Sequence, residues 1–511
     1  MILQEVSAAQ QIGFPILSVM IFLPLAMAFV LNLIEDERIA RTMALVVAGL
    51  ELLLALIVVV SFTPGVSDIQ FAERIGWMAA AGVSYHLGVD GISVLFLPLT
   101  ALLTLLVMLS SWSTTRFRPK PYLTALLVFE AVTIGIFTSL DLVLFFVFWE
   151  LILVPSYILL RLWGIGPQRE YAALKYVMYM MVGSAPLLMG IVLLGINHYH
   201  VAGSLSFDLA VLLRAPVAGE MQTVIFFLLA FGFAVKGPLF PFHTWLPRAL
   251  MEGPLGMSVL LVGLKLGVYG MLRFAIPLVP EAASEWAWLM VVLGVIAVLY
   301  AALIALVQRN LRRLLAFASV GHVGLAIMGL FALNVQGLQG ALMLMLNLGI
   351  ATTGLLFLAG FLHARTGSSE LSAFGGLGRH VPLLATFFFI IGLAFIGVPG
   401  TSGFPGEFLI LLGAFAAHGA LAAIAVLGVI LNAALFLWYY ERAFLGPVTR
   451  DAVRGLRDLR PREVIAAATL AGLVLGIGLF PDPLLRMTSG SVQAVVERVE
   501  QGSGCAGCPA P

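Results

Sequence analysis

The sequence predicts an all-α polytopic membrane protein with about fourteen transmembrane helices, and three observations support this fold class. Of the 511 residues, 61% are hydrophobic and 10% are charged, whereas soluble domains have about 25% charged residues. The mean hydropathy is +1.08. Apolar runs recur along the whole chain, and each is long enough to cross a bilayer core of roughly 30 Å as a helix. These observations exclude a soluble protein with a single membrane anchor.

The apolar runs define the predicted spans in order along the chain. The first run lacks the basic region that precedes a cleavable signal peptide, so it is expected to remain as a helix. The formal net charge of +1 gives no indication of a nucleic-acid partner, and the lipid bilayer is the expected surrounding. The predicted spans are 12–34, 41–62, 89–111, 121–139, 141–163, 171–196, 222–246, 254–275, 286–308, 311–331, 335–363, 380–398 continuing through 405–417, 419–441 and 464–481.

The loops on the two sides of these spans differ in their content of Lys and Arg. One set of loops holds most of the 27 basic residues. Cytoplasmic loops are the ones with excess Lys and Arg. The sequence therefore predicts that this side faces the cytoplasm and that both termini are extracytoplasmic, in an inner (cytoplasmic) cell membrane. The opposite loops hold Arg74, Arg214, Arg273, Arg486 and Arg498.

Two spans are interrupted by Gly and Pro, in "FAVKGPLFPFHTWLP" (233–247) and "FIGVPGTSGFPGEF" (395–408). The fourth and ninth spans begin with the same separation as these interruptions, and five helices per unit would invert the second unit relative to the first. Two inverted five-helix repeats, each with a broken helix, are typical of an ion path near the membrane midplane. The predicted divisions are 1–120 for helices 1–3, 121–285 for the first repeat (helices 4–8), 286–445 for the second repeat (helices 9–13) and 446–511 for the last helix and an extracytoplasmic tail.

Four ionisable residues lie within or beside the apolar runs, namely Glu150, Lys236, Lys265 and Glu407. An ionised side chain at the bilayer centre costs about 2.5–3.5 kcal/mol on insertion scales. A Glu and a Lys in contact stabilise each other's charges, and their separation favours the neutral forms. Lysine can then release its proton. The four residues are therefore predicted to form a proton path.

Each of these residues also has a structural alternative. Glu150 would form a buried hydrogen bond to a neighbouring helix, and Lys236 would stabilise the helix break beside it. Lys265 would extend its ammonium group to the membrane surface. Glu407 would cap the helix that follows the second break.

Further relay groups are predicted from residues near these four. His322 in "SVGHVGLAIMGL" and His243 are candidate proton relays, with a structural hydrogen bond as the alternative. Glu130 in "LLVFEAVTIG" is a candidate member of the path, and Glu51 in "GLELLLAL" has no assigned role.

No redox centre or metal site is predicted on this chain. Its two cysteines, Cys505 and Cys508, are fewer than the four that an ordinary iron–sulfur cluster needs. We find no Gly-rich phosphate-binding loop and no HExxH motif in the sequence. The role of the two cysteines stays open.

Four separated motifs resemble the antiporter-like subunits of respiratory complex I, above all the subunit M branch of bacterial NADH–quinone oxidoreductase, the counterpart of mitochondrial subunit 4. The resemblance covers nearly the whole chain. It implies fourteen helices with two inverted repeats, Glu150 and Lys236 as a charge pair, Lys265 as the central relay and Glu407 as the exit-side carboxylate. It also implies proton translocation within a redox enzyme whose flavin, iron–sulfur clusters and quinone are on partner subunits. The motifs are "FFVFWELILVP", "FAVKGPLFPFHTWLP", "RNLRRLLAFASVGHVG" and "GVPGTSGFPGEF".

The sequence departs from the family pattern at three positions. Arg248 and Leu250 replace an acidic residue and a histidine after "HTWLP", and Asn347 stands where the family usually has a histidine. These changes leave the proton entry route open. Two other interpretations remain: a subunit of a cation/proton antiporter or membrane-bound hydrogenase, and a structural membrane subunit without pumping.

Overall fold

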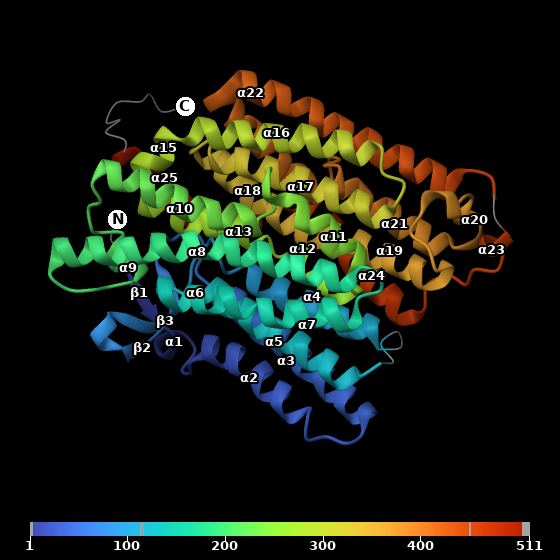
Figure 1. Ribbon diagram of the computed structural model, residues 1–511, viewed down its shortest axis with the longest axis horizontal. Helices are drawn as coiled ribbons and strands as arrows, with labels where there is room; N and C mark the ends of the chain where they lie inside the picture. The colour runs from blue at the N-terminus through green and yellow to red at the C-terminus, as the bar shows by residue number, and fades with distance from the viewer. Residues whose placement is uncertain (1–3, 113–114, 116, 449–450, 503–511) are drawn as a thin grey trace.

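The structure is a computed structural model that describes residues 4–112, 115, 117–448 and 451–502. These residues form a bundle of helices that is elongated in one direction (Figure 1). Among the described residues, 11 helical segments are long and apolar enough to cross a membrane, and three further apolar helices are shorter. The prediction of a mainly helical protein with many membrane spans is therefore confirmed. Cys505 and Cys508 lie outside the described residues.

The N-terminal part contains a small β-sheet, which the sequence analysis did not predict. β1 (Glu5–Ser7) pairs in parallel with β2 (Ile69–Met78), and β2 pairs antiparallel with β3 (Val83–Val89). The prediction of an entirely helical chain was therefore incomplete. The helical elements of this part are α1 (Ala8–Gln11), α2 (Ile16–Val30), α3 (Glu37–Ser61), the 3-10 turn η1 (Ala79–Ala81) and α4 (Phe96–Ser111).

The predicted third span begins too early, at residue 89. Residue 89 is the last of β3, and α4 begins at Phe96. Between them, Asp90 forms a buried ion pair with Arg273 and accepts a hydrogen bond from the Ile92 backbone N–H at 3.0 Å. This ion pair fixes the chain before the helix starts.

The middle of the chain contains three long helices and several short ones. α8 and α10 pack against each other, and α10 ends at Lys236. The elements are α5 (Pro119–Thr138), α6 (Leu142–Leu151), α7 (Leu153–Trp163), α8 (Arg169–Ala202), α9 (Leu209–Leu212), α10 (Gly219–Lys236), η2 (Phe242–Thr244), α11 (Trp245–Glu252), α12 (Leu255–Gly263), α13 (Leu266–Gly270), the π-helix η3 (Met271–Ala275), α14 (Ile276–Leu278) and α15 (Pro280–Glu285).

The last part of the chain begins with two closely packed helices, α16 and α17. The predicted tail after residue 481 is instead helical up to Gly502, because α25 buries one apolar side that includes Val492 and Val496. The elements are α16 (Ala287–Leu306), α17 (Leu311–Leu330), α18 (Val335–Asn347), the π-helix η4 (Leu348–Thr352), α19 (Thr353–Thr366), η5 (Leu371–Ala373), α20 (Leu377–His380), α21 (Pro382–Phe395), α22 (Gly403–Tyr440), the π-helix η6 (Glu441–Leu445), α23 (Asp451–Arg454), α24 (Pro461–Leu479) and α25 (Asp482–Gly502).

Both predicted helix breaks are confirmed. α10 ends before Gly237, and residues 237–241 separate it from η2 and α11. Proline lacks the N–H that would continue the helix, and Pro238 and Pro241 lie in this gap. The second break, residues 396–402, separates α21 from α22. α22 also has a kink at His418, where φ is −141° and ψ is 54°.

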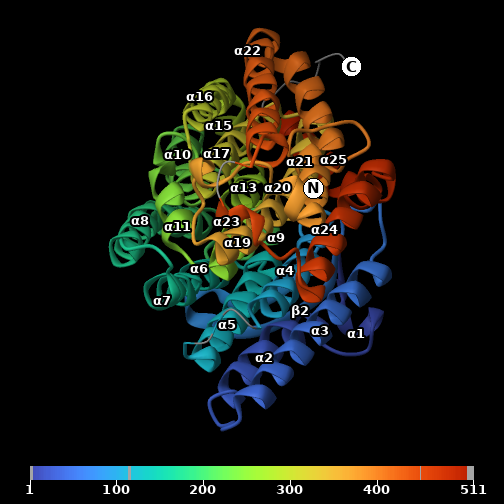
Figure 2. The same cartoon turned by 90° about the vertical axis from the view of Figure 1, so that its right-hand side faces the viewer.

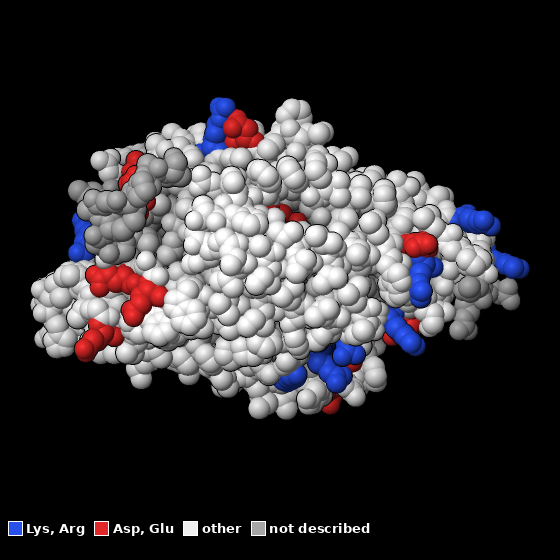
Figure 3. Space-filling model, turned by 90° about the horizontal axis from the view of Figure 1, so that it is seen from above, with Lys and Arg blue, Asp and Glu red and all other residues white. Residues whose placement is uncertain are grey.

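The first helices and α22 lie at opposite edges of the bundle, and the charged side chains are unevenly distributed over its surface. Figure 2 shows α2 and α3 at one edge of the bundle and α22 at the opposite edge. Figure 3 shows a broad area with few charged side chains, with Asp and Glu mainly towards one end, Lys and Arg mainly towards the other, and further charged groups along the edges. An area with few charges is expected where a membrane surrounds the protein.

Candidate functional site

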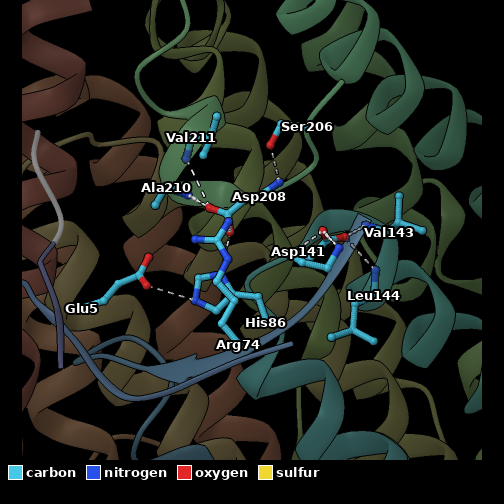
Figure 4. Close-up of polar contacts among 11 residues, drawn as sticks. Glu5, Arg74, His86, Asp141, Val143, Leu144, Ser206, Asp208, Ala210 and Val211 are labelled. Carbon is cyan, nitrogen blue, oxygen red and sulfur yellow. Dashed lines mark hydrogen bonds and ion pairs between the residues drawn. The ribbon is translucent and has the colours of Figure 1, made fainter. Parts of the chain in front are cut away.

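The helix that includes Glu150 is fixed at its start by the β-hairpin (Figure 4). Asp141 is the N-cap of α6 and accepts hydrogen bonds from the backbone N–H groups of Val143 at 2.9 Å and Leu144 at 3.2 Å. The same side chain accepts a hydrogen bond from the Ser84 backbone N–H at 2.9 Å. The hairpin thus sets the direction in which α6 enters the bundle.

A polar cluster beside this cap joins three parts of the chain (Figure 4). His86 Nδ1 lies 2.6 Å from Asp208 Oδ2, and Arg74 Nη2 lies 3.2 Å from the same oxygen. His86 Nε2 lies 3.6 Å from Glu5 Oε2. Burial acts to raise the pKa of Asp208, but the hydrogen bond and charge of His86 and the charge of Arg74 outweigh it and lower the pKa. The cluster therefore holds β1, the hairpin and the start of α9 together outside the spanning helices.

Lys236 is the last residue of α10 and contacts the helix of Glu150. Its Nζ donates a hydrogen bond to the Trp149 carbonyl oxygen at 2.7 Å and lies 3.7 Å from the centroid of the Trp149 ring. The charge of Glu150 also acts on Lys236. In the described part of the chain no direct ion pair joins the two side chains, and Glu150 Oε1 is buried without a hydrogen-bond partner. The predicted charge pair is thus separated by the Trp149 contact.

Lys265 lies in a helix interruption that the sequence analysis did not predict. Its φ of +40° places it in the left-handed region, between α12 and α13. Such a conformation costs about 1–3 kcal/mol and is concentrated at functional sites. Lys265 is 5% exposed, and its Nζ donates a hydrogen bond to Ser319 Oγ on α17 at 2.7 Å. The alternative in which this ammonium group reaches the membrane surface does not apply.

The segments of the two lysines touch each other through their backbones. A Cβ atom at Gly267 would lie 2.2 Å from the Phe233 carbonyl oxygen and 2.3 Å from the Gly237 nitrogen. Only glycine leaves room for this approach. The contact brings the chain just after Lys236 against the chain just after Lys265.

Glu407 lies beside His322, which is one turn after Ser319 on α17. His322 Nε2 is 3.6 Å from Glu407 Oε1 and 3.0 Å from the Phe395 carbonyl oxygen. Residues three apart on a helix lie on the same face, so Ser319 and His322 connect the surroundings of Lys265 with Glu407. In the described structure Glu407 forms no hydrogen bond with the first backbone N–H groups of α22, so the helix-cap alternative is not supported.

A cavity of about 20 Å³ adjoins His322 and Glu407. A cavity needs roughly 10–15 Å³ to hold one water molecule. Asn432 also lines this cavity, and its Nδ2 lies 3.3 Å from His322 Nε2. The space is large enough for one water molecule, and His322, Glu407 and Asn432 are the polar side chains that line it.

Asn347, at the end of α18, stabilises the second helix break from both sides. Its Nδ2 donates a hydrogen bond to the Ala394 carbonyl oxygen at 3.2 Å, and its Oδ1 accepts one from Ser402 Oγ at 2.7 Å. The other two departures from the family pattern lie elsewhere: Arg248 donates a hydrogen bond to Gln168 Oε1 at 2.9 Å, and Leu250 is buried in the core.

Two of the predicted relay residues are not connected to this path by hydrogen bonds among the described residues. His243 is buried, both of its ring nitrogens lack a partner there, and its ring lies 5.1 Å from that of Tyr300. Glu130 is fully buried, and its two carboxyl oxygens also lack a partner there. Among the described residues no group of three or more His, Cys, Asp or Glu side chains is arranged to hold a metal ion.

Three residues of the site were missed by the sequence analysis, namely Trp149, Ser319 and Asn432. Ser319 had a usable signal, because it lies three residues before His322 in a predicted span. Trp149 is adjacent to Glu150, but its carbonyl oxygen and its ring meet Lys236 only through the tertiary fold. Asn432 contacts His322 only through the tertiary fold.

Comparison with known proteins gives matches over most of the chain. Residues 139–432 match a family described as "NADH:quinone oxidoreductase/Mrp antiporter, TM". NADH-quinone oxidoreductase subunit M of Rickettsia prowazekii is 38% identical over 488 residues, which cover 94% of this chain and 98% of that protein. NADH-ubiquinone oxidoreductase chain 4 of Arabidopsis thaliana is 35% identical over 485 residues, covering 94% and 97%. A chain of respiratory complex I from Thermus thermophilus with bound NADH has a TM-score of 0.87 and 34% identity, covering 94% and 99%.

Proposed function

Because the chain belongs to the antiporter-like membrane subunits of NADH–quinone oxidoreductase, in the subunit M branch, we propose that it translocates protons through its buried Glu and Lys residues. It is a multi-pass membrane subunit of a respiratory complex. Proton movement would be coupled to electron transfer on partner subunits. Other membrane subunits of the complex and the lipid bilayer are its partners in this proposal, and the flavin, iron–sulfur clusters and quinone belong to the partner subunits.

The observation that supports this function best is the chain of contacts from Lys265 to Glu407. Lys265 donates a hydrogen bond to Ser319, and His322 lies one turn further along α17 and 3.6 Å from Glu407. Each of these side chains except the serine can bind or release a proton. The serine hydroxyl can donate and accept hydrogen bonds. A proton that leaves Lys265 therefore has a polar route to Glu407.

In the proposed path Glu150 and Lys236 precede Lys265. While Glu150 is ionised, its negative charge favours the charged form of Lys236. The Trp149 carbonyl oxygen and ring hold the ammonium group in place. When Glu150 is neutralised, this support weakens and Lys236 releases its proton towards Lys265. Glu130, His243 and His322 are proposed as accessory relay groups.

The finer architecture is also part of the proposal. The 43-residue segment Gly403–Leu445 would measure about 64 Å as a straight helix, at 1.5 Å per residue. This is about twice the thickness of a bilayer core, so we divide the segment at His418. Its first half completes the interrupted crossing that α21 begins, and its second half is a crossing of its own. This gives fourteen crossings, with inverted repeats at 121–285 and 286–445, flanked by 1–120 and 446–511. The termini are assigned to the extracytoplasmic side of the inner membrane.

The function is tested with Lys265→Ala in membrane vesicles from cells that have no other copy of the subunit. NADH-driven proton uptake should be lost while the complex still assembles, because the variant removes the central proton carrier. Lys120→Ala is the matched control, since Lys120 Nζ donates to the Glu35 carbonyl oxygen at 2.8 Å at an exposed position. Unchanged proton uptake in Lys265→Ala would favour a structural subunit without pumping. Proton movement that depends on Na⁺ or K⁺ rather than NADH would favour an antiporter.

A further inference from the structure

Two carboxyl groups that form no hydrogen bond to the four central residues of the proposed path lie together in the first helices of the bundle, in the part of the chain that the structure describes. Glu51 is on α3 and Glu130 is on α5, and both side chains are 0% exposed. In the described part of the chain all four of their carboxyl oxygens lack a hydrogen-bond partner. Glu51 is close enough to Glu130 to act on its charge. Two unpartnered acids at full burial need an explanation, since buried polar groups are nearly always hydrogen-bonded.

The neighbouring helices bring no positive charge to this pair. α3 and α5 pack against α2 and α4, which contain no ionisable side chain. Along α3, Arg41 is ten residues from Glu51, and along α5, Lys120 is ten residues from Glu130, which is about 15 Å in each helix. Both basic groups already donate to backbone carbonyls, Arg41 to Thr115 at 2.8 Å and Lys120 to Glu35 at 2.8 Å.

The other elements packed against α5 are α6, α7 and β3. α6 contributes Glu150, a third acid. α7 contributes Tyr157 and Arg161, which bond to each other at 2.7 Å at an exposed position. β3 contributes Tyr85, which is bonded to Ser18, and His86, which is paired with Asp208. Among the described residues of these packed elements, none is a basic group placed to neutralise an ionised Glu51 or Glu130.

Two threonine hydroxyls, one on α4 and one on α5, donate to carbonyl oxygens of their own helices. Thr104 donates to the Thr100 carbonyl oxygen at 3.0 Å, and Thr133 donates to the Phe129 carbonyl oxygen at 2.8 Å. An ionised carboxylate at this site would have neither a counter-charge nor a donor. Two ionised carboxylates would also repel each other.

We propose that Glu51 and Glu130 form a buried proton-binding pair in which both carboxyl groups are protonated at neutral pH. Protonation removes both charges and gives each carboxyl group an O–H donor that its neighbour can accept. The ligand is the proton itself, and no other cation is required.

The helix geometry places this pair at the level of the proposed path. Glu130 is eight residues before the end of α5, and Glu150 is eight residues after the start of α6. Each is therefore about 12 Å from the turn between the two helices. In this proposal the protons bound by Glu51 and Glu130 lie at the same membrane depth as Glu150, among the N-terminal helices.

The pair is tested by infrared absorption of the purified complex at neutral pH, in H₂O and D₂O. Glu51→Gln and Glu130→Gln should each remove one protonated-carboxyl band, and the double variant should remove both. Glu463→Gln is the matched control, because Glu463 is ion-paired with Arg365 and should contribute no such band. Glu51→Met and Glu130→Met give the same comparison if a glutamine variant does not assemble.

The opposite results would overturn the proposal. No loss of the band in either variant would show that both acids are ionised, and a spectrum that changes with Na⁺ would then identify a metal cation as the ligand. Loss in only one variant would show that one acid is ionised. The test does not require proton pumping, so it is independent of the proposed function.

Discussion

The two predicted helix breaks differ in the sign of the charge beside them and in the way that charge is stabilised. Lys236 is the last residue of α10, whereas Glu407 lies four residues after the start of α22. The C-terminal end of a helix favours a cation and the N-terminal end favours an anion, within about one turn. Lys236 lies inside that range, and its direct contacts are with the uncharged Trp149, while the charge of Glu150 acts on it without an ion pair. Glu407 lies at its limit and has His322 beside it.

The two breaks therefore differ in the kind of side chain that surrounds each proton carrier. Lys236 ends α10 and Lys265 lies two residues after the end of α12. Each lysine donates to one uncharged oxygen, on Trp149 and Ser319. Glu407 instead adjoins a titratable side chain and a small cavity. We expect substitutions of the lysines to stop transfer, and substitutions of their uncharged partners to slow it.

The largest effect is expected for Lys236. Lys236→Ala should lower proton pumping at least ~100-fold, the lower end of what a positioned proton-transfer group contributes, with a parallel loss of linked electron transfer. Lys236→Arg should be impaired as well, because arginine does not release its proton at accessible pH. Proton uptake by vesicles and NADH oxidation are the measurements. Lys175→Ala is the control, since Lys175 donates to the Thr244 carbonyl oxygen at 3.0 Å at an exposed position. An arginine variant with wild-type pumping would make Lys236 a fixed counter-charge.

A smaller loss is expected for Glu150. Glu150→Gln should lower pumping ~10-fold, equivalent to a barrier higher by about 1.4 kcal/mol, because the charge that supports Lys236 is gone. Glu150→Ala should be at least as impaired. The complex should still assemble, which is checked on native gels. Full pumping by the glutamine variant, or a failure of assembly alone, would contradict this role.

A substitution of Ser319, the uncharged partner of Lys265, should have a smaller effect than a substitution of a lysine. Ser319→Ala removes a hydrogen bond with a net value of about 0.5–1.5 kcal/mol, so pumping should fall by ~2- to 10-fold. Ser156→Ala is the control, because its buried hydroxyl donates to the Ile152 carbonyl oxygen of the preceding turn, at 2.7 Å. Equal rates in the two serine variants would remove Ser319 from the path.

The smallest effect is expected at the end of the chain. Deletion of 503–511, with Cys505 and Cys508, should leave assembly and pumping unchanged. Deletion from residue 482 onwards should impair assembly, because Ser491 Oγ accepts a hydrogen bond from the Gly91 N–H at 2.9 Å and α25 packs on α18. The yield of purified complex measures both. A low yield from the shorter deletion would show that the last residues bind a partner.

The helix breaks were predictable because their causes are local. Pro238 and Pro241 remove backbone donors from one helix, and Pro399 lies in the gap of the other. The membrane spans were similarly evident from their apolar composition. The four buried charges were found because an ionisable residue in an apolar run is conspicuous in any sequence.

The rest depends on tertiary contacts that no local pattern shows. Lys265 adopts a left-handed conformation without a neighbouring proline, and its partner Ser319 lies on another helix. The β-hairpin was missed because its residues lie between two strong apolar runs. Its strand β2 also exposes the apolar side chains of Ile75 and Trp77, so it does not show the usual alternation of buried apolar and exposed polar residues. α25 was missed because its apolar side is narrow, in contrast to the fully apolar spans.

The central claim, that the two breaks belong to one proton path, is tested most directly at Glu407. Infrared difference spectra between the oxidised and NADH-reduced complex should show a carboxyl band that disappears in Glu407→Gln, together with lower pumping. Glu407→Lys should retain partial pumping, because lysine can also accept a proton from the route through His322. Glu463→Gln, which removes an ion-paired carboxylate, should change neither measurement. A Glu407→Gln complex with unaltered pumping and an unaltered spectrum would contradict the account.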